Sequence, residues 1–428
     1  MNWAKNLRCK GSGFPQILPV RQQAEVIYRN LKTRLDTVLP LAMREAGLDM
    51  WVILCQEDDL DPVFRTMIPM DSWCPILQML VFYDHGEEKG IERINISETN
   101  THDLYDRPYI GQLEEKQWPL LVEIIEARNP RRIGVNTGSI QWAAGGLTHN
   151  LYQQLVNKLP EKCVERLESA EAATTRWLAT LTDEEVEVFE DVVHIAHGII
   201  AECYSRKAIV PGVTTVRDLE WHYWQLSTDL GLPLSFSPSF RRMRSLAMKE
   251  RYGEDDQVIR AGDVVYCDVG IYYLRLCTDH KQAAYMLRPG ERNAPVGLQQ
   301  LMAEGNRLQD IFMAEFKEGL SGNELLRNIL TRARKERVPN PRVYSHSLGL
   351  CLHEPGPLIG LPWEQERCPD RGDVRMGYNY AFTVELSVGG PVAEWDGQEV
   401  QLGLEEVVVF TRDGCRLVDG RQTHFYCV

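Results

Sequence analysis

The sequence lacks the features that would place the protein in a membrane, on a nucleic acid or in a disulfide framework. No run of eighteen apolar residues occurs, and the first residues, MNWAKNLRCKGSGF, hold no apolar stretch long enough for a signal peptide. The eleven cysteines are odd in number and include no CxxC pair, which disfavours disulfide scaffolds and zinc fingers. We therefore expect a reduced, cytoplasmic protein.

Basic residues are also in deficit, with 47 Lys and Arg against 61 Asp and Glu and a formal net charge of -14. Phosphate backbones and anionic membranes attract surfaces rich in Lys and Arg. We therefore expect neither nucleic acid nor a membrane as a partner. The hydrophobic content of 44% is ordinary for a globular protein.

The length of 428 residues favours two domains over one. Helical spacing of apolar residues over 20–46 is followed by strand-like runs at 49–55, 76–83 and 132–135. This alternation predicts an α/β N-terminal domain over residues 1–170 and a second domain over 171–428. Residues 169–182 are rich in small side chains, and we interpret them as the linker.

Two aspartates stand out in the second domain because they interrupt strand-like runs. Asp268 ends the run Val-Val-Tyr-Cys, and Asp279 follows eleven residues later. A carboxylate is costly to bury without compensation, so these positions predict a positive partner, most simply a metal ion. Further candidate site residues lie in or beside later β-rich runs: His346, His353, Glu385 and Glu405. Four carboxylates and one imidazole from separate strands would make an oxygen-rich site able to hold two divalent ions.

In order and spacing, these residues resemble the pita-bread metallopeptidase family, which includes methionine aminopeptidases, Xaa-Pro aminopeptidases, prolidases and the metal-free creatinases. The resemblance covers residues 182–414, through the motifs HSLGLCLHEPG, FTVEL and EEVVVFTRDG. The preceding domain looks like that of the two-domain Xaa-Pro aminopeptidase and prolidase branch. The resemblance implies a creatinase/prolidase-like α/β N-terminal domain, an α+β pita-bread catalytic domain and a homodimer.

Carried over residue by residue, the resemblance implies two divalent ions, which could be Mn, Co, Fe or Zn, and which activate a shared water. It implies that His353 donates a hydrogen bond to the substrate or to the developing oxyanion. It also implies that Glu385 transfers the proton of the attacking water, besides binding metal. The implied metal ligands are Asp268, Asp279, His346, Glu385 and Glu405.

The positions expected to contact the substrate depart from the family pattern. Arg251 and Arg342 stand where peptidases of the family usually have histidines, and Gln282 and Gly403 stand where arginines are usual. One hypothesis is that both arginines bind an anionic group on an unusual substrate, since guanidinium suits carboxylate recognition. The alternative is that they only form surface ion pairs.

The resemblance favours a metal-dependent hydrolase that releases an N-terminal residue or splits a dipeptide, next to proline. Two alternatives remain open. One is a non-peptide substrate, as in creatinase-like C–N hydrolases or a lyase, where His353 and Glu385 could act as acid and base without metal. The other is a catalytically inactive binding relative, which retention of the five ligand types disfavours.

Overall fold

The computed structural model describes residues 16–109, 116–353 and 355–428, and its chain forms two compact units. One unit spans Pro19–Thr182, and the other holds Asp183–Val428 together with the chain up to Leu18. The division falls later than the predicted boundary at residue 170. The segment predicted as a linker instead forms the end of a strand and a helix of the N-terminal unit, because Ala173, Trp177 and Leu178 are buried.

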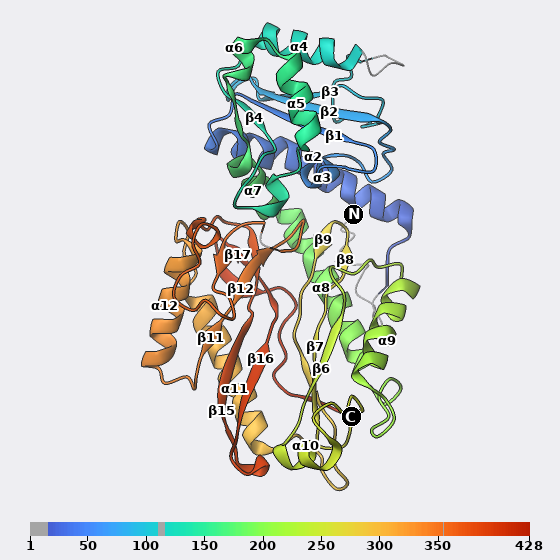
Figure 1. Cartoon of the computed structure of the whole chain (residues 1–428), viewed down its shortest axis with the longest axis vertical. Coiled ribbons are helices and arrows are strands. Elements are labelled where there is room, and N and C mark those ends of the chain that lie inside the picture. The colour runs from blue at the N-terminus through green and yellow to red at the C-terminus, as the bar shows by residue number, and fades with distance from the viewer. Residues whose placement is uncertain (1–15, 110–115, 354) are drawn as a thin grey trace. The chain divides into compact units, whose positions relative to one another are not determined.

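The N-terminal unit is a five-stranded sheet with helices (Figure 1). The strand order is β3-β2-β1-β4-β5, in which β1 pairs antiparallel with β2 and parallel with β4. Its strands are β1 (Met50–Gln56), β2 (Leu77–Asp84), β3 (Ile91–Asn95), β4 (Ile133–Val135) and β5 (Leu167–Ser169). Its helices are α2 (Val20–Glu45), α3 (Pro62–Met67), α4 (Gln117–Arg128), η2 (Trp142–Ala144), α5 (His149–Lys158), α6 (Glu161–Val164) and α7 (Glu171–Ala179).

The central strand β1 shows why this sequence forms such a layer. Residues 50–55 are all buried, as expected for a strand covered on both faces. The helix α2 buries a stripe with helical spacing that includes Leu31, Leu35 and Leu39. Pro40 lies within this helix without ending it. The predicted α/β N-terminal fold is confirmed.

The C-terminal unit contains four sheets, ordered β19-β10-β7-β6, β11-β15-β16, β13-β12-β14-β17-β18 and β8-β9. The first strands are β6 (Ser239–Met243), β7 (Val264–Asp268), β8 (Tyr272–Tyr273), β9 (Leu276–Cys277) and β10 (Ala283–Tyr285). The next are β11 (Arg342–Val343), β12 (Ser345–Leu348), β13 (Leu358–Ile359), β14 (Tyr380–Thr383) and β15 (Leu386–Val392). The last are β16 (Gln398–Leu404), β17 (Val407–Thr411), β18 (Gly414–Leu417) and β19 (Tyr426–Cys427).

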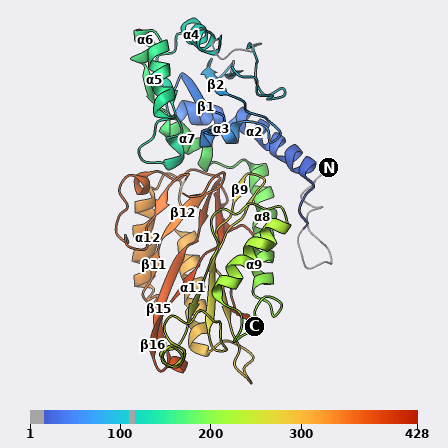
Figure 2. The same cartoon turned by 45° about the vertical axis from the view of Figure 1, so that its right-hand side comes forward.

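Among the described residues, five helices accompany these sheets, together with the short turns η3 (Arg371–Asp373) and η4 (Ala393–Trp395). They are α8 (Asp183–Cys203), α9 (Val216–Asp229), α10 (Leu246–Tyr252), α11 (Val296–Ala314) and α12 (Gly322–Lys335). Figures 1 and 2 show α8 and α9 beside β6 and β7, and α11 and α12 beside β11 and β15. Gly305 lets α11 approach β16 closely, because a Cβ there would lie 2.6 Å from Leu404 Cδ1.

This arrangement confirms the predicted α+β catalytic domain, in which helices support strands that carry the candidate residues. Within the described part of the chain, no helix is long and apolar enough to cross a membrane. Every cysteine that the structure describes is free.

Candidate functional site

The pairing of the strands sets four charged residues in one row. In the β7–β10 pair, Ala283 lies opposite Tyr266 and Ala284 opposite Val265. The same register continues through the bridge between Val269 and His280. This register places Lys281 directly opposite Asp268, next to the pair of His280 and Val269.

The row continues on the other side of Lys281. Lys281 and Glu405 exchange two backbone hydrogen bonds, each of 3.1 Å. Glu405 in turn lies opposite Glu385, since Leu386 pairs with Leu404 on one side and Thr383 with Val407 on the other. Residues opposite each other on antiparallel strands project to the same face. The side chains of Asp268, Lys281, Glu405 and Glu385 therefore meet.

The ammonium group of Lys281 lies among the three carboxylates of this row. Lys281 Nζ is 2.5 Å from Glu385 Oε1, 2.7 Å from Glu405 Oε2 and 3.1 Å from Asp268 Oδ2. Burial by itself would lower the pKa of Lys281, but the carboxylates, Glu405 foremost, outweigh it and raise that pKa well above its usual range. Lys281 is therefore charged.

Sequence reasoning missed Lys281, although a signal was present. Lys281 stands two residues after Asp279 in a strand-like run, and side chains two apart on a strand share a face. The sequence therefore indicated that a lysine shares a strand face with the predicted metal ligand Asp279. Its distance from the other carboxylates depended on the register of three strands, which the sequence does not give.

The remaining candidates gather beside this row. His346 Nε2 is 3.6 Å from Asp279 Oδ2 and 3.9 Å from Glu405 Oε1, and His353 Nε2 is 3.8 Å from Asp279 Oδ2. The rings of His346 and His353 are 4.7 Å apart. The side chain of His353 is 42% exposed, against 6% for His346 and 3% for Asp279. His353 is thus the imidazole that a substrate can reach.

The electrostatics of the cluster reflect many buried carboxylates in a small volume. Burial, reinforced by neighbouring carboxylates, raises the pKa of Glu405 well above its usual range. Burial likewise raises the pKa of Glu385 and Asp268, against the opposing effect of Lys281. For Asp279 the effect of burial is outweighed by His346 and Lys281, which lower its pKa. The carboxylates thus repel one another and favour additional positive charge.

The donors suit a divalent ion at one position of the cluster. Oxygens of Asp279 (Oδ1) and Glu405 (Oε1) are buried and accept no hydrogen bond from the described residues, and His346 Nε2 lies nearby. Carboxylate and imidazole donors suit Mn, Fe, Co or Zn. Ligand atoms of His346, Glu385 and Glu405 lie within 4.8 Å of one another, as do those of Asp279, His346 and His353. Between Asp268, Glu385 and Glu405, by contrast, the position of a cation is taken by Lys281 Nζ.

A buried network behind the row holds its strands. Glu406, next to Glu405, accepts hydrogen bonds from Gln282 Nε2 at 2.8 Å and the Gln422 backbone at 2.8 Å. His197 Nε2 and His280 Nδ1 lie 2.9 and 3.2 Å from Glu406 Oε2. Gln282, which stands where the family usually has arginine, therefore anchors the segment that carries Lys281. Sequence reasoning did not find this network.

The two arginines predicted to bind substrate lie in different places. Arg342 is exposed on β11, two residues before Tyr344, whose backbone N–H bonds to the Glu385 carbonyl at 3.1 Å. Arg342 therefore projects to the same face of the sheet as Glu385, two residue positions away along the strand. Arg251 is exposed at the end of α10, with its guanidinium 5.2 Å from the Tyr252 ring centre.

The structure does not bring Arg251 to the cluster. The helix α10 follows Met243, which pairs with Val264, whereas Asp268 lies at the opposite end of β7 (Figure 1). Another arginine, Arg241, pairs opposite Tyr266 and so shares the face of Asp268. Arg241 contributes, after Lys281, to holding down the pKa of Asp268 that burial raises.

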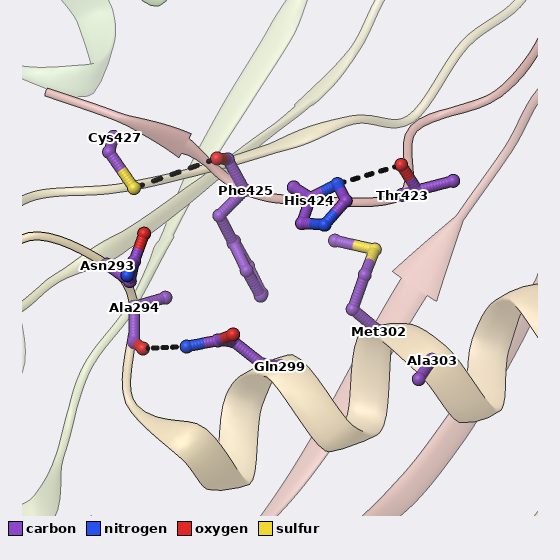
Figure 3. A pocket seen from close by; sticks show the side chains of 9 residues that line it. All are labelled: Asn293, Ala294, Gln299, Met302, Ala303, Thr423, His424, Phe425 and Cys427. Atoms are coloured by element: carbon purple, nitrogen blue, oxygen red, sulfur yellow. Dashed lines mark hydrogen bonds between the residues drawn. The ribbon is translucent and has the colours of Figure 1, made fainter.

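A pocket elsewhere in this unit contains none of the predicted site residues (Figure 3). It lies between the first turns of α11 and the C-terminal segment, and includes Gln299, Met302 and Phe425. Two of its lining side chains bond to backbone carbonyls close in sequence: Gln299 to Ala294 and Cys427 to Phe425. It offers no cluster of metal-ligating groups.

Comparison with known proteins gives a family match and several structural neighbours. The profile of metallopeptidase family M24 matches residues 187–412, more than half of the chain. No curated protein matches the sequence. Among solved structures, the X-Pro aminopeptidase from Thermotoga maritima MSB8 is similar over 91% of this chain and 100% of its own, with a TM-score of 0.63 and 15% identity.

Two further structures show the same likeness. The Xaa-Pro dipeptidase from Bacillus anthracis covers 95% of this chain and 100% of its own, with a TM-score of 0.56 and 15% identity. The prolidase from Pyrococcus furiosus covers 90% of this chain and 98% of its own, with a TM-score of 0.53 and 14% identity. At such low identity these neighbours establish the two-domain fold.

Proposed function

Because the chain belongs to metallopeptidase family M24, we propose that it is a metal-dependent hydrolase of the Xaa-Pro aminopeptidase or prolidase type. It releases an N-terminal residue or splits a dipeptide. The observation that supports this proposal is the position of His346 Nε2, 3.6 Å from Asp279 Oδ2 and 3.9 Å from Glu405 Oε1. Glu405 Oε1 and the other Asp279 oxygen, Oδ1, are buried and accept no hydrogen bond from the described residues. Unsatisfied buried carboxylate oxygens are costly unless a cation or donor completes them.

The ion would be held at His346, whose ligand atom lies within 4.8 Å of atoms of Glu385 and Glu405 and, in a second group, of Asp279 and His353. When bound, a divalent ion polarises the scissile carbonyl and lowers the pKa of a water. Mn, Co, Fe and Zn all suit this donor set. Of the five ligands that the family resemblance implies, Asp268, Glu385 and Glu405 each place one oxygen on Lys281 Nζ.

Glu385 serves as the general base and acid. Its carboxylate is 12% exposed and its Oε1 accepts a hydrogen bond from Lys281 Nζ at 2.5 Å, which fixes its position. Burial raises the pKa of Glu385, and a raised carboxylate pKa favours taking a proton from water and passing it to the leaving amine. His353, the exposed imidazole, donates a hydrogen bond to the carbonyl oxygen of the substrate.

Arg342 flanks the site and is the arginine that could bind a carboxylate of the substrate, such as the C-terminus of a dipeptide. Arg251 lies at the other end of β7 and has no such role in this proposal. In assembly, the proposed enzyme is a homodimer, as the family resemblance implies.

The test is an assay of metal-depleted protein resupplied with Mn, Co, Fe or Zn against Xaa-Pro dipeptides, Xaa-Pro tripeptides and matched peptides without proline. Hydrolysis that requires an ion and prefers proline is the expected result. Metal-dependent activity on none of these peptides would refute the assigned substrate class.

A second candidate function follows from Lys281. A site with a built-in cation and an altered substrate side resembles the requirements of a C–N hydrolase or lyase acting on a small non-peptide substrate. In that reaction His353 and Glu385 act as acid and base. Activity towards amidino or betaine-like compounds that persists after metal removal would favour this candidate over the peptidase.

A further inference from the structure

Lys281 bears on how many ions the site can hold, a question that rests on the proposed metal-dependent function. The ammonium group touches one oxygen of each of three carboxylates that the family resemblance assigns to metal. Its distances of 2.5–3.1 Å are those of charge-assisted hydrogen bonds.

A divalent ion bound by the same oxygens would have to occupy the same volume. Bonds between a carboxylate oxygen and an ion such as Zn²⁺ are about 2.0–2.2 Å long, so an ion between Asp268, Glu385 and Glu405 would stand where Lys281 Nζ stands. The two cations would also repel each other strongly in this buried setting. Lysine and ion therefore exclude each other at this position.

The side chain of Lys281 is held there by its surroundings. Its backbone is fixed against Glu405 by two hydrogen bonds, and Asp268 lies opposite on the other neighbouring strand. The next residue, Gln282, is anchored to Glu406 at 2.8 Å. The side chain is only 17% exposed, so leaving the carboxylates would require breaking three ion pairs at once.

The ammonium group of Lys281 does not contact the donor atoms around His346. His346 Nε2 lies 3.6 Å from Asp279 Oδ2 and 3.9 Å from Glu405 Oε1, and the buried oxygens Asp279 Oδ1 and Glu405 Oε1 lack hydrogen bonds within the described chain. We propose that Lys281 replaces one of the two cations, so that the site binds a single divalent ion, at His346.

Counting ions tests this directly. The full chain is stripped with a chelator, saturated with Mn²⁺ and freed of excess metal, and its Mn content is measured by inductively coupled plasma mass spectrometry. We expect about one ion per chain for the native protein and about two for Lys281→Ala, with Lys281→Arg remaining at one or below. The matched control is Lys249→Ala, which removes a lysine of α10 whose Nζ lies 2.8 Å from Glu254 Oε1. This variant should still bind one Mn ion per chain.

Electron paramagnetic resonance provides a second readout, and its result for the native protein does not depend on any variant folding. Native protein loaded with Mn²⁺ should give the spectrum of isolated ions, whereas Lys281→Ala should show the exchange coupling of an ion pair. Two ions per native chain, or a coupled spectrum from it, would overturn the role of Lys281 and leave the proposed hydrolase intact. One ion in Lys281→Ala would also overturn it.

Failure of the underlying function gives a different result. If the native chain retains no Mn²⁺, Co²⁺, Fe²⁺ or Zn²⁺ at all, the metal-dependent hydrolase itself is wrong, and with it the single-ion site. Circular dichroism of each variant shows whether a changed ion content accompanies a folded protein.

Discussion

The network behind the site predicts a pH-dependent loss of stability. His197 lies with Nε2 2.9 Å from Glu406 Oε2 and Nδ1 3.1 Å from Asp419 Oδ2. Burial lowers the pKa of His197, but Glu406 and Asp419 outweigh it and raise that pKa to about 9. Because this exceeds the ordinary value of 6.5, protonated His197 stabilises the fold fully below pH 6.5, and the contribution disappears as the pH rises through 9.

The magnitude follows from the gap between the two pKa values. At about 1.4 kcal/mol for each pH unit, the gap corresponds to roughly 3 kcal/mol of unfolding free energy. The pKa of Glu406, which His197 and His280 lower to about 2 against the effect of burial, reflects the same contact, so the two values are not added. Of the other imidazoles facing this group, His280 stays neutral because burial lowers its pKa, and His194 is exposed beside Asp419.

The assay is urea unfolding at pH 6 and pH 9.5 with a chelator present, so that metal binding does not contribute. Hydrogen exchange of peptides from α8 reports the C-terminal unit separately. We expect the native chain to lose about 3 kcal/mol more than His197→Gln over this range. His149→Gln, an exposed histidine on α5, serves as the control and should behave as the native chain. An equal loss in His197→Gln would refute the reasoning.

Three further predictions concern catalysis. Glu385→Gln should lower kcat by about 10²–10⁴-fold, since the proton acceptor is lost, and steady-state kinetics with an ion count would show whether only catalysis changed. His353→Ala should lower kcat with little change in ion content, because this imidazole meets the substrate; unchanged kcat would exclude it from the reaction. Arg342→Ala should raise KM for dipeptides with a free carboxylate but not for their amides, whereas Arg251→Ala should change neither, and a reversed pattern would contradict the placement of these arginines.

Much of the fold could be predicted because its signals are local. The helix α2 and the strand β1 carry unbroken periodic or apolar patterns, and their observed bounds differ from the predicted ones by a residue or so. The linker prediction for residues 169–182 was wrong because small residues also suit a buried helix. In α7, Ala173 and Trp177 are fully buried, which composition alone does not reveal.

The candidate site was predicted only in part, for a physical reason. Asp268, Asp279 and His346 could be recognised from the sequence because they are polar residues in or beside apolar runs. Lys281 could be recognised less clearly, because a strand lysine usually reaches solvent with its long side chain. Its contacts depend on which residues lie opposite it, and register is a property of paired strands. Arg251 shows the same dependence on pairing: counting along the chain offered it as a substrate contact or a surface residue, and its helix α10 follows Met243, which pairs with Val264 at the end of β7 opposite Asp268.

Charge balance explains how such a lysine can persist among ligands. Asp268, Asp279, Glu385 and Glu405 together carry four negative charges when ionised, which two divalent ions would neutralise. Lys281 and one ion supply three positive charges, and Arg241, on the face of Asp268, supplies the fourth from the rim. An ion could therefore be exchanged for two side chains at unchanged net charge. Since uncompensated buried carboxylates are strongly destabilising, the lysine and the arginine together would account for the acidic residues that this cluster keeps under the proposed single-ion site.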